Sequence, residues 1–207
     1  MKFKLLIIFI SSTLLIGAGK EPTINEKGDA ESGKKLVATC AACHGEDGNS
    51  LAGIWPSLAG QNYKYLLKQL RLVKSGEREI VEMVGQLDNL SDQDLKDISA
   101  FYSDQKNKIG QVKIDKLELG KKLYYSGNLD KGVPACTACH SPRGLGNAPA
   151  AYPLLSGQQP DYVAKALRDY RSGERLNEDP SKIMISIAYK LDDNEIEALS
   201  SFVHGLH

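Results

Sequence analysis

The sequence predicts an all-α protein of two tandem domains related by internal duplication. Short segments of the first half return in the same order in the second half, and self-similarity at a long period indicates a repeated structural unit. Apolar residues recur at helical spacing in both halves, and no convincing run alternates apolar and polar residues as strands do. The repeated segments are residues 33–36 and 120–123, 56–61 and 153–158, and 75–78 and 172–175.

Residues 1–19 are typical of a secretory signal peptide. Two lysines precede a largely apolar stretch, residues 5–16, and the small residues 17–19 follow it. The apolar stretch is shorter than the ~20 residues of a membrane-spanning helix. We therefore expect export to the periplasm and cleavage near Ala18 or Gly19, with an uncleaved membrane anchor as the alternative.

Residues 20–104 are predicted to form the first domain. Helices are expected over residues 30–39, over residues 63–74 and from Ser91 onwards, where serine and two aspartates make a typical helix N-terminus. The apolar face of the middle helix consists of Tyr63, Leu66, Leu67, Leu70 and Val73. A helix of this spacing has one side for a core and one for water.

Residues 105–115 are polar and are predicted to link the first domain to a second one, residues 116–207. The helices expected in the second domain repeat those of the first. They cover residues 116–126 and 162–170 and begin again at Asp192. Each domain is small, and small domains bury a lower fraction of their surface, so each is expected to need a further apolar group in its core.

A short motif in each half supplies the chemistry. Two cysteines separated by two residues and followed at once by histidine are the attachment signature of c-type haem. The cysteines form thioethers with the porphyrin, and the histidine becomes the proximal iron ligand. The two motifs use all four cysteines of the chain. They are Cys40, Cys43 and His44 in the first half, and Cys136, Cys139 and His140 in the second. The sequence therefore predicts two haem c groups, each inside one all-α domain.

Other uses of paired cysteines explain the pattern less well. A zinc site could use both pairs, but zinc gives no reason for a histidine at the end of each. A thioredoxin-like redox pair belongs in a strand–helix context, which the sequence does not suggest. A disulfide framework is excluded if the thiols form thioethers.

Met83 and Met184 are the predicted distal iron ligands. They are the only methionines apart from Met1, and one occurs in each half before the last helix. A histidine–methionine pair closes the iron to other ligands and raises its reduction potential, which suits an electron carrier. His204 and His207 are interpreted as exposed residues of the C-terminal tail. Arg71 and Arg168 recur at matched positions and either contact haem carboxylates or lie on a solvated helix face.

The charge balance argues against some classes of partner. The chain has 26 basic and 26 acidic residues, and loss of residues 1–19 removes two lysines. A mildly acidic surface does not suggest a nucleic-acid-binding protein, which needs a concentrated basic face. Adsorption to a membrane through a basic patch is disfavoured for the same reason, although another peripheral association with the membrane stays open.

With both motifs and both methionines, the chain resembles the dihaem cytochrome c4 family over its whole mature length. The resemblance is carried by residues 40–50, 90–94, 136–140, 144–149 and 205–207. It implies two cytochrome c domains whose haems lie near a shared interface and contact each other on the propionate side. It also implies that redox partner proteins exchange electrons with the chain, typically a donor complex and a terminal oxidase of a respiratory chain.

The resemblance also implies several contacts. The carbonyls of Pro56 and Pro153 should orient the two proximal histidines. Gly33 should pack on Phe101 or Tyr102, and Gly120 on Phe202. Ser141 departs from the family, because a glycine normally follows the haem motif, as Gly45 does here.

Three functions are considered for a chain with two such motifs. The favoured one is a periplasmic carrier of two electrons, with no enzymatic activity of its own. The second is an electron-transfer subunit of a larger membrane complex, which could have the same ligands. The third is a dihaem redox enzyme such as a peroxidase or a sulfur-compound dehydrogenase, which needs an open or displaceable iron site.

Overall fold

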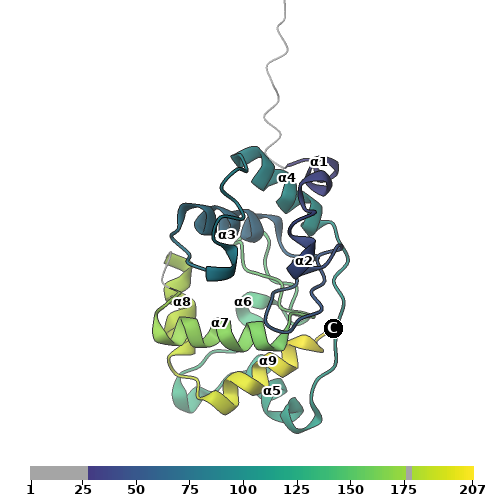
Figure 1. Cartoon of the computed structure of the whole chain (residues 1–207). Coiled ribbons are helices and arrows are strands. Elements are labelled where there is room, and N and C mark those ends of the chain that lie inside the picture. The colour runs from purple at the N-terminus through teal and green to yellow at the C-terminus, as the bar shows by residue number, and fades with distance from the viewer. Residues whose placement is uncertain (1–27, 176–178) are drawn as a thin grey trace, which may run out of the picture.

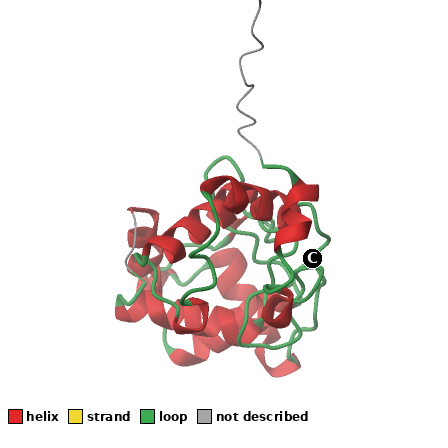
Figure 2. Cartoon of the chain, turned by 45° about the horizontal axis from the view of Figure 1, so that its top comes forward, coloured by secondary structure: helices red, strands yellow, loops and turns green. Residues whose placement is uncertain are grey.

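The computed structural model describes residues 28–175 and 179–207, so the predicted signal peptide lies outside the described residues. The predicted all-α fold is confirmed: within these ranges the chain has helices and two isolated β-bridges but no strand (Figure 2). The helices are α1 (Ala30–Leu36), α2 (Ala41–His44), α3 (Tyr63–Ser75), η1 (Val81–Met83), α4 (Asp92–Ser103), α5 (Ile114–Ser126), η2 (Leu129–Lys131), α6 (Thr137–His140), α7 (Pro160–Ser172), α8 (Asp179–Ala188) and α9 (Asp193–His204). None of the described helices is long and apolar enough to cross a membrane.

The two halves of the chain occupy opposite ends of the molecule. We call residues 28–104 the first half and residues 114–207 the second half. Figure 1 shows α1, α3 and α4 at one end and α5, α7 and α9 at the other, with the intervening segment running along one side. That segment is tied to both halves, because the amide of Lys108 donates to Asn49 Oδ1 at 2.7 Å and the amide of Gly110 donates to the carbonyl of His204 at 2.9 Å.

In each half the first helix crosses the last at a glycine. A Cβ added at Gly120 of α5 would lie 2.4 Å from the carbonyl oxygen of Ala198 and 2.6 Å from Cβ of Phe202 in α9, so the expected packing of Gly120 on Phe202 is confirmed. A Cβ at Gly33 of α1 would lie 2.1 Å from the carbonyl oxygen of Asp97 in α4. The nearest atoms thus belong to a residue one turn before the aromatic partners expected for Gly33.

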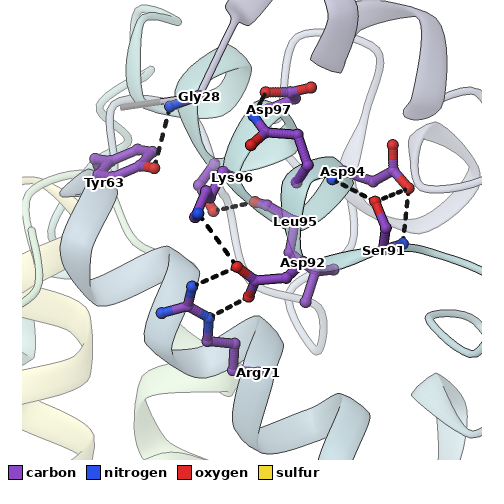
Figure 3. A network of polar contacts seen from close by, with 11 residues as sticks. Gly28, Tyr63, Arg71, Ser91, Asp92, Asp94, Leu95, Lys96 and Asp97 are labelled. Carbon is purple, nitrogen blue, oxygen red and sulfur yellow. Dashed lines mark hydrogen bonds and ion pairs between the residues drawn. The ribbon is translucent and has the colours of Figure 1, made fainter. Parts of the chain in front are cut away.

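Polar contacts hold α3 against α4 (Figure 3). Arg71 of α3 donates from Nε to Asp92 Oδ1 at 2.6 Å and from Nη2 to Oδ2 at 2.8 Å. Ser91 caps α4, because its Oγ accepts from the amide of Asp94 while the Asp94 carboxylate accepts from the amide of Ser91. Such a reciprocal capping box satisfies two amides that the first turn of a helix leaves without partners.

Five of the six predicted helices are present with small shifts at their ends. They are the helices over residues 63–74, 116–126 and 162–170 and those that begin at Ser91 and Asp192. The helix predicted over residues 30–39 ends at Leu36, because the chain turns there and the amide of Ala41 bonds to the carbonyl of Val37 at 3.1 Å. α5 begins at Ile114, so its first turn, where Asp115 lies favourably, includes the last residues of the predicted linker.

Candidate functional site

Each cysteine–histidine motif forms one short helical turn. Cys40 and Cys136 are the N-cap residues of α2 and α6, and in each motif the second cysteine and the histidine follow three and four residues later. Residues three and four apart lie on one face of a helix, so each turn presents two thiols and one imidazole to the same side. Both turns therefore have the geometry that attachment of one planar group at three points requires.

The thiols have the properties of structural rather than reactive cysteines. All four are partly buried, and none forms a disulfide. Burial raises the pKa of Cys40 and raises the pKa of Cys136 to about 11. A redox-active pair or a metal thiolate instead needs a lowered pKa. Within the described residues no three histidine, cysteine or acidic side chains come together as a metal-binding group.

The predicted proximal histidines are buried and point in a fixed direction. His44 Nδ1 lies 2.8 Å from the carbonyl oxygen of Pro56, and His140 Nδ1 lies 3.1 Å from that of Pro153. A carbonyl can only accept, so Nδ1 carries the proton and Nε2 keeps its lone pair for a metal. Burial lowers the pKa of both imidazoles, which favours this neutral form. The orientation by Pro56 and Pro153 expected from the resemblance is confirmed.

The two predicted distal ligands occupy different local structures. Met83 ends the 3₁₀ helix η1 and packs against a cluster of Leu67, Leu87 and Leu95. Met184 lies within α8, a helix that the sequence analysis did not predict. Both methionines are partly buried. Cys40 packs with a separate cluster that includes Leu66 and Tyr102, so in the first half the predicted attachment and distal residues belong to different parts of the core.

At two matched positions of the repeat, one half has a tyrosine where the other half has a valine. In the first half α4 supplies the buried Tyr102, and the chain after α1 supplies Val37; in the second half α5 supplies the buried Tyr124, and α9 supplies Val203. Tyr124 donates from its hydroxyl to the carbonyl of Ser141 at 2.7 Å. The Tyr102 hydroxyl is buried beside the Cys40 thiol and has no nitrogen or oxygen partner among the described residues. A buried hydroxyl in this state favours a further polar group in the first half.

Arg78 and Arg175, the arginines of the repeated Ser-Gly-Glu-Arg segments, meet between the halves. Arg175 is 7% exposed and donates from Nη2 to Tyr65 Oη at 2.9 Å and to Gln69 Oε1 at 3.3 Å. Arg78 donates from Nη1 to the same Gln69 oxygen at 2.7 Å and from Nη2 to Tyr162 Oη at 3.3 Å. This cluster was not predicted from the sequence, although the repetition of the segment was a signal for it.

The arginine cluster carries positive charge that the described residues do not neutralise. The partners of Arg78 and Arg175 there are neutral tyrosine and glutamine side chains, and the Arg175 guanidinium lies 4.6 Å from the centroid of the Tyr170 ring. Burial raises the pKa of Tyr162, but the two guanidinium groups outweigh it and lower the value to about 8. A buried charge without a counter-ion is costly, so the cluster has the chemistry of an anion site.

The arginines singled out from the sequence lie elsewhere. Arg71 is paired with Asp92, and Arg168 donates to Glu197 Oε1 at 2.5 Å, both on exposed helix faces. The solvated-face alternative is therefore correct for these two. The interpretation of His204 as an exposed tail residue was wrong, because the side chain is only partly exposed and its Nδ1 lies 3.0 Å from the carbonyl of Gln158. His207 is exposed, as expected.

Comparisons with known proteins give one consistent result. The model of the cytochrome c family matches residues 30–105 and again residues 117–207. Cytochrome c4 of Azotobacter vinelandii is 48% identical over 94% of this chain and 97% of its own length. The crystal structure of reduced recombinant cytochrome c4 from Pseudomonas stutzeri superposes with a TM-score of 0.84 at 49% identity, covering 87% of this chain and 100% of that one. A thiosulfate dehydrogenase electron acceptor of Stutzerimonas stutzeri is 30% identical over 92% of this chain and 90% of its own length.

Proposed function

Because the chain belongs to the cytochrome c4 family and is a dihaem electron carrier, we propose that it works in the periplasm and delivers electrons from a respiratory donor complex to a terminal oxidase. Covalent haem c supplies reversible one-electron chemistry at its iron. The observation that carries the proposal is the duplicated histidine–proline geometry, with Nδ1 of His44 and His140 each held by a backbone carbonyl. Two matched centres of this kind suit storage and transfer of two electrons.

In this proposal each half supplies four groups to its haem. The thioethers come from Cys40 and Cys43 in the first half and from Cys136 and Cys139 in the second. The iron of the first half would be held by His44 and Met83, and that of the second half by His140 and Met184. The carbonyls of Pro56 and Pro153 fix the imidazole orientation and strengthen the histidines as electron donors to the iron.

The described residues fit two haem groups in three further respects. The Tyr102 hydroxyl lies buried beside the Cys40 thiol and has no nitrogen or oxygen partner in the described part of the chain. Burial raises the pKa of the Cys40 and Cys136 thiols and keeps these two thiols neutral. Arg78 and Arg175 lie between the halves with no carboxylate partner in the described part of the chain, and they would bind the haem carboxylates. These carboxylates would then neutralise the buried guanidinium groups.

Closed iron sites distinguish a carrier from a dihaem enzyme. Met83 and Met184 as iron ligands would prevent small ligands from binding and would keep the ligand set the same in both oxidation states. The experiment is the optical spectrum of the purified holoprotein, oxidised and then reduced under carbon monoxide. Two haems per chain, a sulfur-to-iron band in the oxidised form and no carbon monoxide adduct are expected. An adduct in the unmodified protein would contradict the ligand set and favour the enzyme class.

A sulfur-compound dehydrogenase is the second candidate for the electron donor. It is favoured by the relative that is named a thiosulfate dehydrogenase electron acceptor and aligns with 92% of this chain. Reduction by a purified thiosulfate dehydrogenase, compared with reduction by membranes that contain the respiratory donor complex, would separate the two donors. Co-purification with an oxidase tests whether the protein is a bound subunit of a larger complex.

A further inference from the structure

Gln158 of the second half is bonded to the backbone of the first half at Ser57. The amide of Ser57 donates to Gln158 Oε1 at 2.8 Å, and Gln158 Nε2 donates to the carbonyl of Ser57 at 2.9 Å. Gln158 is 4% exposed and Ser57 is 8% exposed. One side chain thus satisfies both backbone groups of a buried residue in the other half.

Gln61 of the first half makes the equivalent contact with Leu154 of the second half. The amide of Leu154 donates to Gln61 Oε1 at 2.8 Å, and Gln61 Nε2 donates to the carbonyl of Leu154 at 3.2 Å. Gln61 is 4% exposed and Leu154 is 8% exposed. Gln61 and Gln158 end the repeated segments 56–61 and 153–158, so the two contacts form a reciprocal pair between the halves.

In both contacts the glutamine binds the residue that directly follows a proline, and the carbonyl of that proline accepts the hydrogen bond from a proximal histidine. Ser57 follows Pro56, whose carbonyl accepts from His44 Nδ1, and Leu154 follows Pro153, whose carbonyl accepts from His140 Nδ1. The carbonyl of a residue and the amide of the next residue belong to one planar peptide group. Fixing the amide of Ser57 or Leu154 therefore fixes the orientation of the carbonyl that the histidine uses.

We infer that each half positions the proximal histidine of the other half through this glutamine: Gln158 acts on His44, and Gln61 acts on His140. The inference rests on the proposed histidine ligation. Both glutamines are positioning residues, since neither contacts a histidine itself. The interface thereby links the properties of the two irons without any contact between the metal ligands.

The expected direction follows from the hydrogen bond at Nδ1. A carbonyl held in place makes the imidazole a stronger donor to iron and stabilises the oxidised state. Loss of Gln158 leaves the Ser57 amide and carbonyl unsatisfied, so the peptide group rotates to find other partners and the bond to His44 weakens. The reduction potential of the haem at His44 should then rise, while the haem at His140 stays near its original potential.

The test compares the Gln158→Met and Gln61→Met variants of the holoprotein. Methionine has similar length and makes neither amide contact. Redox titration gives the two potentials, and the paramagnetically shifted haem methyl signals in NMR spectra give the state of each haem. The signals are assigned to the halves with the ligand variants Met83→Ala and Met184→Ala. If either methionine variant fails to assemble, Gln158→Asn and Gln61→Asn, which are one methylene too short to make both bonds, replace them.

Gln159→Leu is the matched control. Gln159 also crosses the interface, where its Nε2 donates to the carbonyl of Ser50 at 2.6 Å. The amide of Ser50 donates to Ser57 Oγ at 3.2 Å. In this variant, however, the amide of Ser57, which shares a peptide group with the Pro56 carbonyl, keeps its bond to Gln158. Loss of Gln159 should weaken the interface and leave both potentials unchanged. A general effect of interface damage would instead appear in the control as strongly as in the Gln158 variant.

The expected result is a crossed pattern: the Gln158 variant shifts the potential and methyl signals of the haem at His44, and the Gln61 variant those of the haem at His140. The inference is overturned if each variant affects its own half more, if both haems shift equally, or if neither shifts. Failure of the proposed ligation is a separate outcome, because it would appear in the unmodified protein as a carbon monoxide adduct or a missing sulfur-to-iron band.

Discussion

Tyr124 donates a hydrogen bond from its hydroxyl to the backbone carbonyl of Ser141 at a distance of 2.7 Å. Ser141 follows the second haem motif and has a φ of 66° and a ψ of 159°. This conformation is strained for any residue with a side chain and is essentially confined to glycine. Gly45, at the same place after the first motif, has a φ of 80° and a ψ of 153° without that strain. The hydrogen bond from Tyr124 therefore helps to stabilise the strained backbone conformation of Ser141.

Ser141→Gly should stabilise the second half. Relief of the backbone strain is worth about 1–3 kcal/mol, and the lost bond from the Leu145 amide to Ser141 Oγ, 3.0 Å long, offsets about 1 kcal/mol of it. We expect a higher free energy of unfolding in guanidinium titrations of the holoprotein. Gly45→Ser is the matched control and should destabilise the first half. Equal stability of Ser141→Gly and the unmodified protein would show that the strain is relieved in some other way.

Met184→Ala should open one haem. Removal of the thioether leaves the iron beside His140 without its proposed distal ligand, so the reduced protein should bind one equivalent of carbon monoxide. Met83→Ala should open the other haem in the same way. Optical difference spectra count the adducts. If Met184→Ala leaves both haems unreactive towards carbon monoxide, the ligand assignment in the second half is wrong.

The site could be predicted from the sequence wherever its chemistry is local. One helical turn carries Cys40, Cys43 and His44, so spacing alone identifies it. The contact of His44 with Pro56 spans 12 residues and was reached only through the resemblance to a known family. The bonds of Gln158 to Ser57 span 101 residues, and no periodicity or motif in a single sequence encodes such a pairing.

The arginines illustrate the same limit. Arg71 and Arg168 lie on regular helices at matched positions, which drew attention to them, but both pair with acids on the surface. Arg78 and Arg175 follow the helices α3 and α7 and are brought together only when the halves associate. Burial of a charge is a property of the assembled interface, and the local sequence around an arginine does not determine it.

Arg175→Met should destabilise the holoprotein strongly. If haem carboxylates pair with the arginine cluster, removal of one guanidinium leaves buried negative charge without a partner, at a cost of about 3–5 kcal/mol. Arg168→Met removes a surface ion pair and should cost about 0–1 kcal/mol. Guanidinium titrations of both variants measure the difference. Equal, small losses would contradict a role of Arg175 in binding the carboxylates.

Asp192 should make the second half sensitive to acid. The carboxylate caps α9, accepting from the amide of Glu195 at 2.9 Å, and it pairs with Lys131 at 2.8 Å. The hydrogen bond from Lys131, followed by that from the Glu195 amide, lowers the pKa of Asp192 below its ordinary value. A carboxyl with a lowered folded-state pKa stabilises the fold above its unfolded pKa, about 3.9, and this stabilisation is lost as the pH falls through the lower folded value.

Asp192→Asn tests this dependence, because asparagine is an equally good N-cap but cannot ionise. The variant should be less stable than the unmodified protein near pH 6, and the difference should shrink as the pH is lowered below about 4. Lys131→Met should flatten the same part of the pH profile, and the double variant should lose less than the sum of the two single losses. Unfolding curves measured at several pH values give these quantities. A stability difference that stayed constant down to low pH would mean that the cap geometry, and not the charge on Asp192, is what the substitution disturbs.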